Sequence, residues 1–298
     1  MPADTNAPLQ QTQTASVVSY IRARKILFVC GLVVAFVLLQ VALLPFGEVS
    51  KLASTNPGET AFQVYQAEQA KELHKPFRKR QTWVGLNRVS KSLVDAVIVS
   101  EDGTFWSHSG FDWYEFRESF ERNMKEGRAA RGASTISQQL VKNLYLSPSK
   151  NPIRKLKEWI LTWWLEQRVS KSRILELYLN LIEWGDGVYG IQAASQFYFK
   201  KSAGDLSLDE ATRLAAIIPS PRRWSLAAGS RIAERRAGII LQRMQLRGMI
   251  PAVSGSVPVD SASIFAPLPE EGDTLPEQQS SPSVPPSQPQ DSTTTREL

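Results

Sequence analysis

Polar side chains that follow Gly132 have the types and spacing to bind a phosphate or a hydroxyl-rich ligand. At about 100° per residue, Ser134, Gln138 and Lys142 fall on one stripe of a helix, and the apolar residues between them face another way. The stripe places hydroxyl, amide and ammonium groups beside a helix N-terminus, where anions bind. The alternative is an ordinary surface helix on which Thr135 and Gln138 form a capping box.

A second group of charges surrounds one acid, Glu158, and consists of Lys150, Arg154, Lys155 and Lys157. These cations could neutralise a multiply charged phosphate, with Glu158 tuned by them or helping to hold a metal ion. The alternative is a solvated face in which Arg154 and Glu158 pair at i, i+4, worth about 0.2–0.5 kcal/mol. Stacking aromatics are not interleaved with these cations, so nucleic acid is not expected as a partner.

A third candidate is Glu101, which ends an apolar helical segment and is followed by Asp102 and Gly103. A carboxylate against an apolar wall can serve as a general acid or base. As an ordinary acid at a helix C-terminus, Glu101 would be slightly unfavourable with the helix dipole, which favours a functional role. His108, seven residues later, is expected to be structural and hydrogen-bonded under the loop.

The elements that must position these groups are expected to be helices. Apolar residues recur at helical spacing over residues 93–101, 111–124, 135–146, 154–169, 172–182 and 207–218. Ser207 and Glu210 fit a capping box, and Pro219 stops the last of these helices. Strand-like alternation is scarce, so the sequence predicts a mainly α domain. The run from Gly185 to Gly190 satisfies G-x-G-x-x-G, but it follows a helical pattern, and we interpret it as a turn between helices.

Residues 26–44 form an uncharged apolar run, long enough as a helix to cross a bilayer. A cleaved signal peptide is the alternative, but the run ends in Leu-Leu-Pro-Phe rather than in small residues. Arg22, Arg24 and Lys25 precede the run, so the positive-inside rule places the N-terminus in the cytoplasm. We therefore expect a single-pass membrane protein whose chain after residue 45 lies outside.

Charge and composition divide the rest of the chain. Residues 1–251 carry 34 bases and 22 acids, whereas 252–298 carry one base and seven acids among many Pro and Ser. Cys30 is the only cysteine, which excludes a disulfide scaffold. The expected organisation is a disordered cytoplasmic N-terminus (1–25), a transmembrane helix (26–44), a juxtamembrane segment (45–84), a folded helical domain (85–251) and a disordered acidic tail (252–298).

Five ordered blocks between about residues 85 and 225 resemble the peptidoglycan glycosyltransferases of family 51. They read EDGTFWSHSG (101–110), GASTISQQLVKN (132–143), RKLKE (154–158), RILELYLNLIEWGDGVYGIQAASQFYF (173–199) and ATRLAAIIPSPRRW (211–224). Only the tail follows residue 251, so the chain resembles the monofunctional biosynthetic members rather than the bifunctional class A penicillin-binding proteins. The resemblance implies a lysozyme-like helical fold with a small membrane-facing lobe, here residues 111–131.

The resemblance also implies a reaction, the polymerisation of lipid II into β-1,4-linked glycan with inversion and release of undecaprenyl pyrophosphate. By position in the blocks, Glu101 matches the general base, and Glu158 matches a second glutamate near the donor pyrophosphate, with a divalent cation, Mg²⁺ or Mn²⁺. The remaining matched or neighbouring residues are expected to bind substrate: Ser134, Gln138, Gln139, Lys142, Asn143, Lys150, Arg154, Lys155 and Lys157. Many relatives have an arginine at the position of Lys150. A lysine there keeps the positive charge but cannot form the two parallel hydrogen bonds that an arginine gives to a phosphate. In the fourth block Glu176, Tyr178 and Asn180 match the motif, and their helical period suggests packing.

The implied partners are lipid II, the growing lipid-linked strand, membrane lipids and other cell-wall synthesis proteins. The implied location is the bacterial cytoplasmic (inner) membrane, with the catalytic domain on the periplasmic, outer side. A membrane-anchored, lysozyme-like or lytic enzyme is the main alternative function, because that fold also uses a glutamate. Such a hydrolase needs a second carboxylate or a substrate group rather than a basic cradle. A non-catalytic scaffold is a further alternative, for which loss of Glu101 and Glu158 would be the sign, and both are present.

Overall fold

The chain folds mainly into helices, as the sequence predicts. The computed structural model describes residues 7–126, 134–148 and 151–251. Its α-helices are α1 (Ala7–Ala42), α2 (Phe46–Lys51), α3 (Ala61–Glu72), α4 (Lys91–Glu101), α5 (Trp113–Glu126), α6 (Ile136–Tyr145), α7 (Pro152–Arg168), α8 (Lys171–Leu181), α9 (Ile191–Phe199), α10 (Leu208–Ile217) and α11 (Arg231–Leu246). Short 3₁₀ turns occupy η1 (Leu86–Arg88), η2 (Ala203–Asp205) and η3 (Leu226–Ala228).

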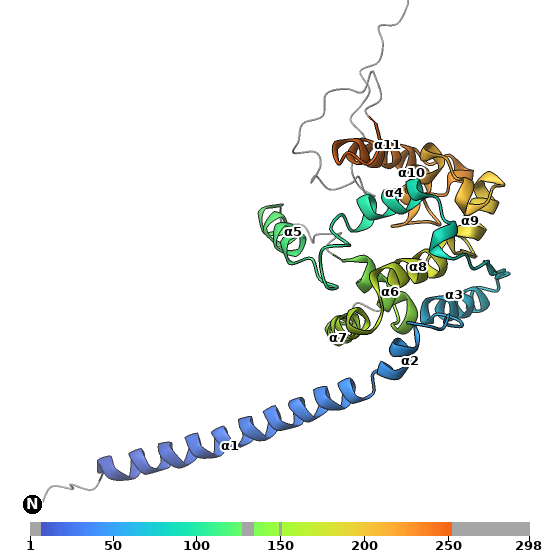
Figure 1. Ribbon diagram of the computed structural model, residues 1–298. Coiled ribbons are helices and arrows are strands. Elements are labelled where there is room, and N and C mark those ends of the chain that lie inside the picture. The colour runs from blue at the N-terminus through green and yellow to red at the C-terminus, as the bar shows by residue number, and fades with distance from the viewer. Residues whose placement is uncertain (1–6, 127–133, 149–150, 252–298) are drawn as a thin grey trace, which may run out of the picture.

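Helix α1 projects away from all the other helices (Figure 1). It contains most of the predicted membrane span, and it is the one helix of the described residues that is long and apolar enough to cross a membrane. The prediction of disorder is wrong for residues 7–25, which are part of this helix. Neither glycine nor proline occurs between Leu9 and Cys30, so nothing in the sequence stops the apolar helix from extending toward the N-terminus.

The segment after α1 packs on α7 and α8. Helix α2 lies against α7, where the rings of Phe46 and Trp164 are 5.1 Å apart and the Trp164 Nε1 donates to the Phe46 carbonyl at 3.1 Å. From α8, the Arg173 Nε donates to the Leu52 carbonyl at 2.9 Å. Buried side chains begin at Leu44, so the packed domain begins well before the predicted boundary at residue 85.

The six helices predicted from apolar spacing all exist, as α4 to α8 and α10, with ends within two residues of the prediction. The capping box of Ser207 and Glu210 is present at the start of α10. Helix α5 covers most of the predicted membrane-facing lobe, whose residues 127–131 lie outside the described part of the chain. The tail, 252–298, also lies outside it.

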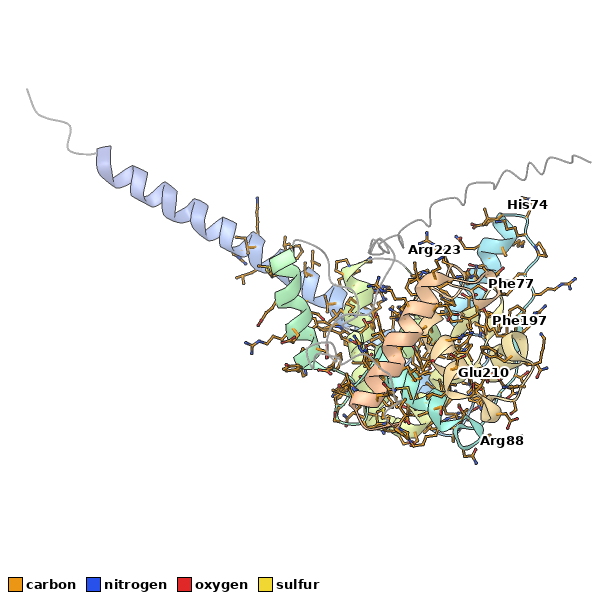
Figure 2. All side chains as sticks on the ribbon, turned by 90° about the horizontal axis from the view of Figure 1, so that it is seen from above. His74, Phe77, Arg88, Phe197, Glu210 and Arg223 are labelled. Carbon is orange, nitrogen blue, oxygen red and sulfur yellow. The ribbon has the colours of Figure 1, made fainter. Side chains whose placement is uncertain are left out.

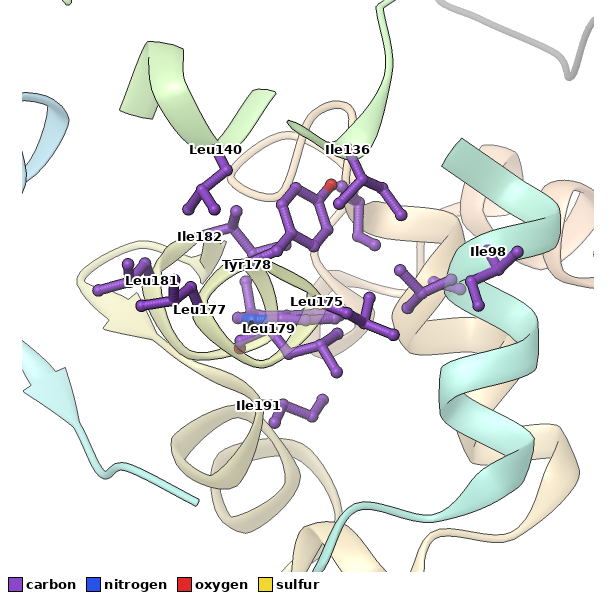
Figure 3. Close-up of a cluster of buried hydrophobic side chains, with 14 of the residues drawn as sticks. Ile98, Ile136, Leu140, Leu175, Leu177, Tyr178, Leu179, Leu181, Ile182 and Ile191 are labelled. Atoms are coloured by element: carbon purple, nitrogen blue, oxygen red, sulfur yellow. Dashed lines mark hydrogen bonds between the residues drawn. The ribbon is translucent and has the colours of Figure 1, made fainter. Parts of the chain in front are cut away.

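Helices α6 and α8 form the centre of the hydrophobic core. Ile136 and Leu140 of α6 pack on the apolar face of α8 around Tyr178, as Figure 3 shows. Helices α4, α10 and α11 pack on one another beside this pair (Figure 1). The ends of α4 and α6 are therefore held by a shared core.

Three short strands form a small sheet that the sequence did not reveal. They are β1 (Arg80–Gln81), β2 (Glu183–Gly185) and β3 (Val188–Tyr189), in the order β1-β3-β2, with β1 and β3 parallel. The G-x-G-x-x-G run therefore makes the turn of a hairpin between α8 and α9. Gly187 has a φ of 69°, and a Cβ there would lie 2.5 Å from the Arg78 carbonyl oxygen, so only glycine fits.

Asn180 holds the chain before α4 against α8, which gives a test of the fold. Its amide exchanges two hydrogen bonds with the backbone of Val84, at 2.9 and 2.8 Å, and both partners are buried. Asn180→Ala leaves both backbone groups unsatisfied, at a cost of about 2–4 kcal/mol. We expect the melting temperature in detergent, followed by circular dichroism, to fall by roughly 5–15 °C. The exposed Asn87→Ala is the control, and equal melting of the two variants would contradict the assignment.

Candidate active site

Glu101 is the last residue of α4, and neighbouring side chains hold its carboxylate in place. The Ser100 hydroxyl donates to Oε1 at 3.0 Å, and the Gln139 Nε2 donates to Oε2 at 3.0 Å. The residue is partly exposed. Each donor still leaves a carboxylate lone pair available, so Glu101 can accept a proton from a substrate hydroxyl.

Asp102 fixes the loop behind this glutamate. Its buried carboxylate accepts from the backbone N–H of Ile136 at 2.9 Å and lies 2.9 Å from the Nε2 of His108. The Gly110 N–H donates to the His108 Nδ1 at 3.1 Å, so Nε2 is the ring nitrogen that donates to Asp102. The structural role expected for His108 is confirmed.

The start of α6 carries the predicted capping box. The Thr135 hydroxyl accepts from the Gln138 N–H, and the Gln138 side chain accepts from the Thr135 N–H at 3.0 Å. Gln138 is 4% exposed, so its side chain does not join a surface stripe with Ser134 and Lys142. The prediction that Gln138 belongs to a surface stripe is wrong, because the capping box holds its amide in the protein interior. We therefore leave Gln138 out of the proposed substrate site.

Lys142, one turn further along α6, interacts electrostatically with both predicted glutamates, Glu101 and Glu158. Lys142 is exposed as a residue, but desolvation of its ammonium beside the protein lowers its pKa below the ordinary value. The charge of Glu158 raises this pKa, Arg154 and Lys155 lower it, and Glu101 raises it. Lys142 is thus the group that connects the α4 carboxylate electrostatically with the charges of α7.

Helix α7 carries the basic cluster and the second glutamate. Asn151 caps it and Pro152 occupies its first turn, which sets the start of the helix directly before the charged residues. The Glu158 side chain is only 2% exposed. Arg154 donates to its Oε2 at 2.7 Å and Lys155 to its Oε1. Both carboxylate oxygens therefore face cations, and the pairing offsets the cost of burying the charge.

The other predicted binding residues lie at the same edges of α6 and α7. Ser134 is partly exposed at the start of α6, and its carbonyl accepts from the Gln139 Nε2 at 3.4 Å. The Asn143 amide donates to the Gln139 carbonyl at 2.9 Å, which ties it to its own helix. Lys157 is partly exposed on α7, and Lys150 lies outside the described residues.

Sequence reasoning missed the groups that hold the functional ones. Ser100 was not a candidate, although a hydroxyl directly before a possible catalytic acid is a usable signal. Among the three motif residues of α8, the packing role is confirmed for Asn180 and for Glu176, whose carboxylate accepts from the Leu86 N–H at 3.0 Å. Tyr178 is buried, but its hydroxyl contacts Gln139 at 2.9 Å.

Comparison with known proteins identifies a family. A family model described as transglycosylase matches residues 67–245, more than half of the chain. A protein of Dechloromonas aromatica (strain RCB), named biosynthetic peptidoglycan transglycosylase, is 42% identical over 218 residues, which cover 73% of this chain and 94% of the relative. Relatives of the same name from Janthinobacterium sp. (strain Marseille) and Chromobacterium violaceum are 39% and 41% identical, each over 74% of this chain and 96% of their own length.

The similarity covers nearly the whole length of these relatives, and the matched region contains α4, α6, α7 and α8, which carry the site. It confirms the family that the five sequence blocks indicate. The chain belongs to the transglycosylase family.

Proposed function

We propose that this transglycosylase is a peptidoglycan glycosyltransferase that polymerises lipid II, with Glu101 as the general base. The 4-hydroxyl oxygen of the acceptor GlcNAc attacks the anomeric carbon of the growing strand, and its proton passes to Glu101. The bond from that carbon to the pyrophosphate oxygen breaks, and the electron pair leaves with undecaprenyl pyrophosphate. Attack from the opposite face inverts the carbon and gives a β-1,4 link. The observation that most directly supports this proposal is that the Ser100 hydroxyl and the Gln139 amide hold the Glu101 carboxylate in place.

The leaving pyrophosphate is proposed to lie at the cations of α6 and α7. Lys142 on one helix and Arg154, Lys155 and Lys157 on the other can stabilise the charge that develops on it. A pyrophosphate is a good leaving group once its charge is offset, so no proton donor is required. Asn143 and Ser134 border this region and can bind sugar or phosphate oxygens.

The side chains around Glu158 do not form a metal-binding set of their own. Within residues 7–126, 134–148 and 151–251, no group of three His, Cys, Asp or Glu side chains could hold an ion. Both oxygens of Glu158 already face Arg154 and Lys155. We therefore derive no step through Mg²⁺ or Mn²⁺, and the divalent cation stays a prediction from the family resemblance.

A lytic activity is less well supported by this geometry. A hydrolase of this kind needs a second carboxylate beside the scissile bond or a substrate group in its place. The Asp102 oxygens are taken by Ile136 and His108, and those of Glu158 by two cations. Neither carboxylate is arranged as the partner of Glu101, whereas the cations suit a pyrophosphate.

We further propose that the chain is anchored in the cytoplasmic membrane by α1 and rests on it with α5 and α7. Trp113 and Tyr114 of α5 are 63% and 66% exposed, and Trp163 of α7 is also exposed. In both views α5 lies toward the side from which α1 extends (Figures 1 and 2). Exposed aromatic side chains beside a membrane helix suit the lipid interface. The lipid tail of the substrate would then stay in the bilayer.

Glu101→Gln keeps the size of the side chain and one acceptor oxygen, which can still bind the Gln139 amide, but removes the base. We expect the rate of polymerisation of labelled lipid II, followed by gel, to fall by roughly 10²–10⁴-fold, because proton transfer by a positioned base contributes that much. Binding of a donor-site pyrophosphate ligand should be largely retained. The exposed Glu72→Gln serves as control. Near-normal polymerisation by Glu101→Gln would exclude its role as base.

Lys142 predicts a pH dependence. Only its protonated form stabilises a pyrophosphate, and its lowered pKa means that this form is lost at lower pH than for an ordinary lysine. The rate should therefore fall on the alkaline side below pH 10.5, and Lys142→Arg should move the fall to higher pH. Lys142→Gln should lose roughly 100-fold at neutral pH, where the lysine is protonated, and should show no alkaline fall of its own, whereas the exposed Lys71→Gln should keep the parent profile. A profile that is identical for lysine and arginine would contradict this assignment.

The membrane-facing surface can be tested with a single labelled cysteine. In a Cys30→Ser background, Tyr114→Cys carries an environment-sensitive dye on α5, and Gln196→Cys carries it on α9 as the control. Phe197, next to the control position, lies at the end of the molecule away from α1 (Figure 2). On reconstitution into vesicles, we expect the emission of the α5 dye to shift to the blue and that of the α9 dye to stay unchanged. Equal spectra would argue against the proposed surface.

A further inference from the structure

Tyr178 of α8 carries a hydroxyl that packing alone does not explain. Its ring is buried in the core beneath Ile136 and Leu140, as Figure 3 shows, and a phenylalanine would fill the same space. The hydroxyl lies at the edge of this apolar cluster and donates to the Gln139 Oε1 at 2.9 Å. Its hydrogen-bond partner is thus a side chain that itself contacts Glu101.

The two ends of the Gln139 amide are not equivalent in this arrangement. The Glu101 carboxylate accepts hydrogen bonds, so the Nε2 of Gln139 must face it, at 3.0 Å. The amide oxygen then points toward Tyr178, which must donate. If the amide turned over, its oxygen would face the carboxylate and two acceptors would meet. The Glu101 carboxylate and the Ser134 carbonyl, which both accept from the Gln139 Nε2, set this orientation, and the phenol stabilises it by donating to the amide oxygen on the other side.

The phenol is suited to act as a permanent donor. Burial raises the pKa of Tyr178 well above its ordinary value, and the charges of Glu101 and Asp102 raise it further. It therefore keeps its proton over the range in which the enzyme works. A neutral, buried hydroxyl with a rigid ring holds its partner at little cost in side-chain entropy.

We propose that Tyr178 is a positioning residue for the reaction, which orients Gln139 and through it the carboxylate of Glu101. It touches neither substrate, and its contribution passes through the Gln139 amide. This role goes beyond the packing that the sequence suggests for Tyr178, and it rests on the proposed role of Glu101 as base.

Tyr178→Phe removes the hydroxyl and keeps the ring. We expect kcat for polymerisation of lipid II to fall about tenfold, with KM changed by less than about twofold, because a hydrogen bond that organises the base and not the substrate is lost. The control is Tyr198→Phe, which removes a hydroxyl that donates to the Trp184 carbonyl at 3.0 Å, away from Glu101. It should keep the kcat of the parent enzyme. Melting temperatures of both variants show whether any loss of folding is shared.

A double-mutant cycle tests whether Tyr178 acts through Gln139. In a Gln139→Ala background, Tyr178→Phe should lower kcat by less than about twofold, because its target is gone. The same tenfold loss in both backgrounds overturns the inference, and so does a normal kcat for Tyr178→Phe in an enzyme that Glu101→Gln inactivates. An active Glu101→Gln variant instead overturns the proposed function, so the two failures are distinguishable.

Discussion

The carboxylate of Asp102 joins the end of one helix to the beginning of another, and the geometry of the site depends on this junction. It accepts from the first N–H of α6 while its own residue directly follows Glu101 at the end of α4. The Thr135 hydroxyl adds a second bond across the same junction, to the Gly110 carbonyl at 2.8 Å. A buried carboxylate at a helix N-terminus is electrostatically favourable. Glu101 directly precedes Asp102, and Gln139 lies one turn after Ile136. The bond between Asp102 and Ile136 therefore fixes the position of the base relative to Gln139.

From this junction the site extends along α6 to α7. On each helix, the helical period brings side chains three or four residues apart onto the same face. Gln139 reaches back to Glu101, and Lys142, three residues later, comes within the influence of α7. On α7, Arg154 and Lys155 reach Glu158 at i, i+4 and i, i+3. Burying one acid among several cations holds their side chains in place without neutralising the whole cluster. Glu158 is therefore better explained as an organiser of the cations than as a second acid or base.

Local patterns in the sequence predicted the helices and two capping boxes, because periodicity and caps depend on neighbours within one or two turns. What depends on distant contacts could not be predicted. The parallel pairing of Arg80 with Val188 joins segments far apart in the chain, and strands of two or three residues carry no alternation to detect. The packing of α2 on α7 is of the same kind. Gln138 shows a conflict between two local rules, since its stripe position pointed outward and its cap drew it inward.

The positive charges at α6 and α7 affect the protonation of Lys142, and this effect bears on which substrate the site prefers. Burial lowers the pKa of Lys142 most, the charge of Glu158 offsets part of this, and Arg154 and Lys155 lower it further, so the site without substrate disfavours the charged lysine. A pyrophosphate placed among these groups would add negative charge beside Lys142 and raise that pKa. By linkage, a shift in pKa on binding is free energy of binding, so the anion binds more tightly where the lysine is protonated. The desolvation of Lys142, together with repulsion from Arg154 and Lys155, would thus favour a multiply charged leaving group over the neutral sugar of a finished glycan strand.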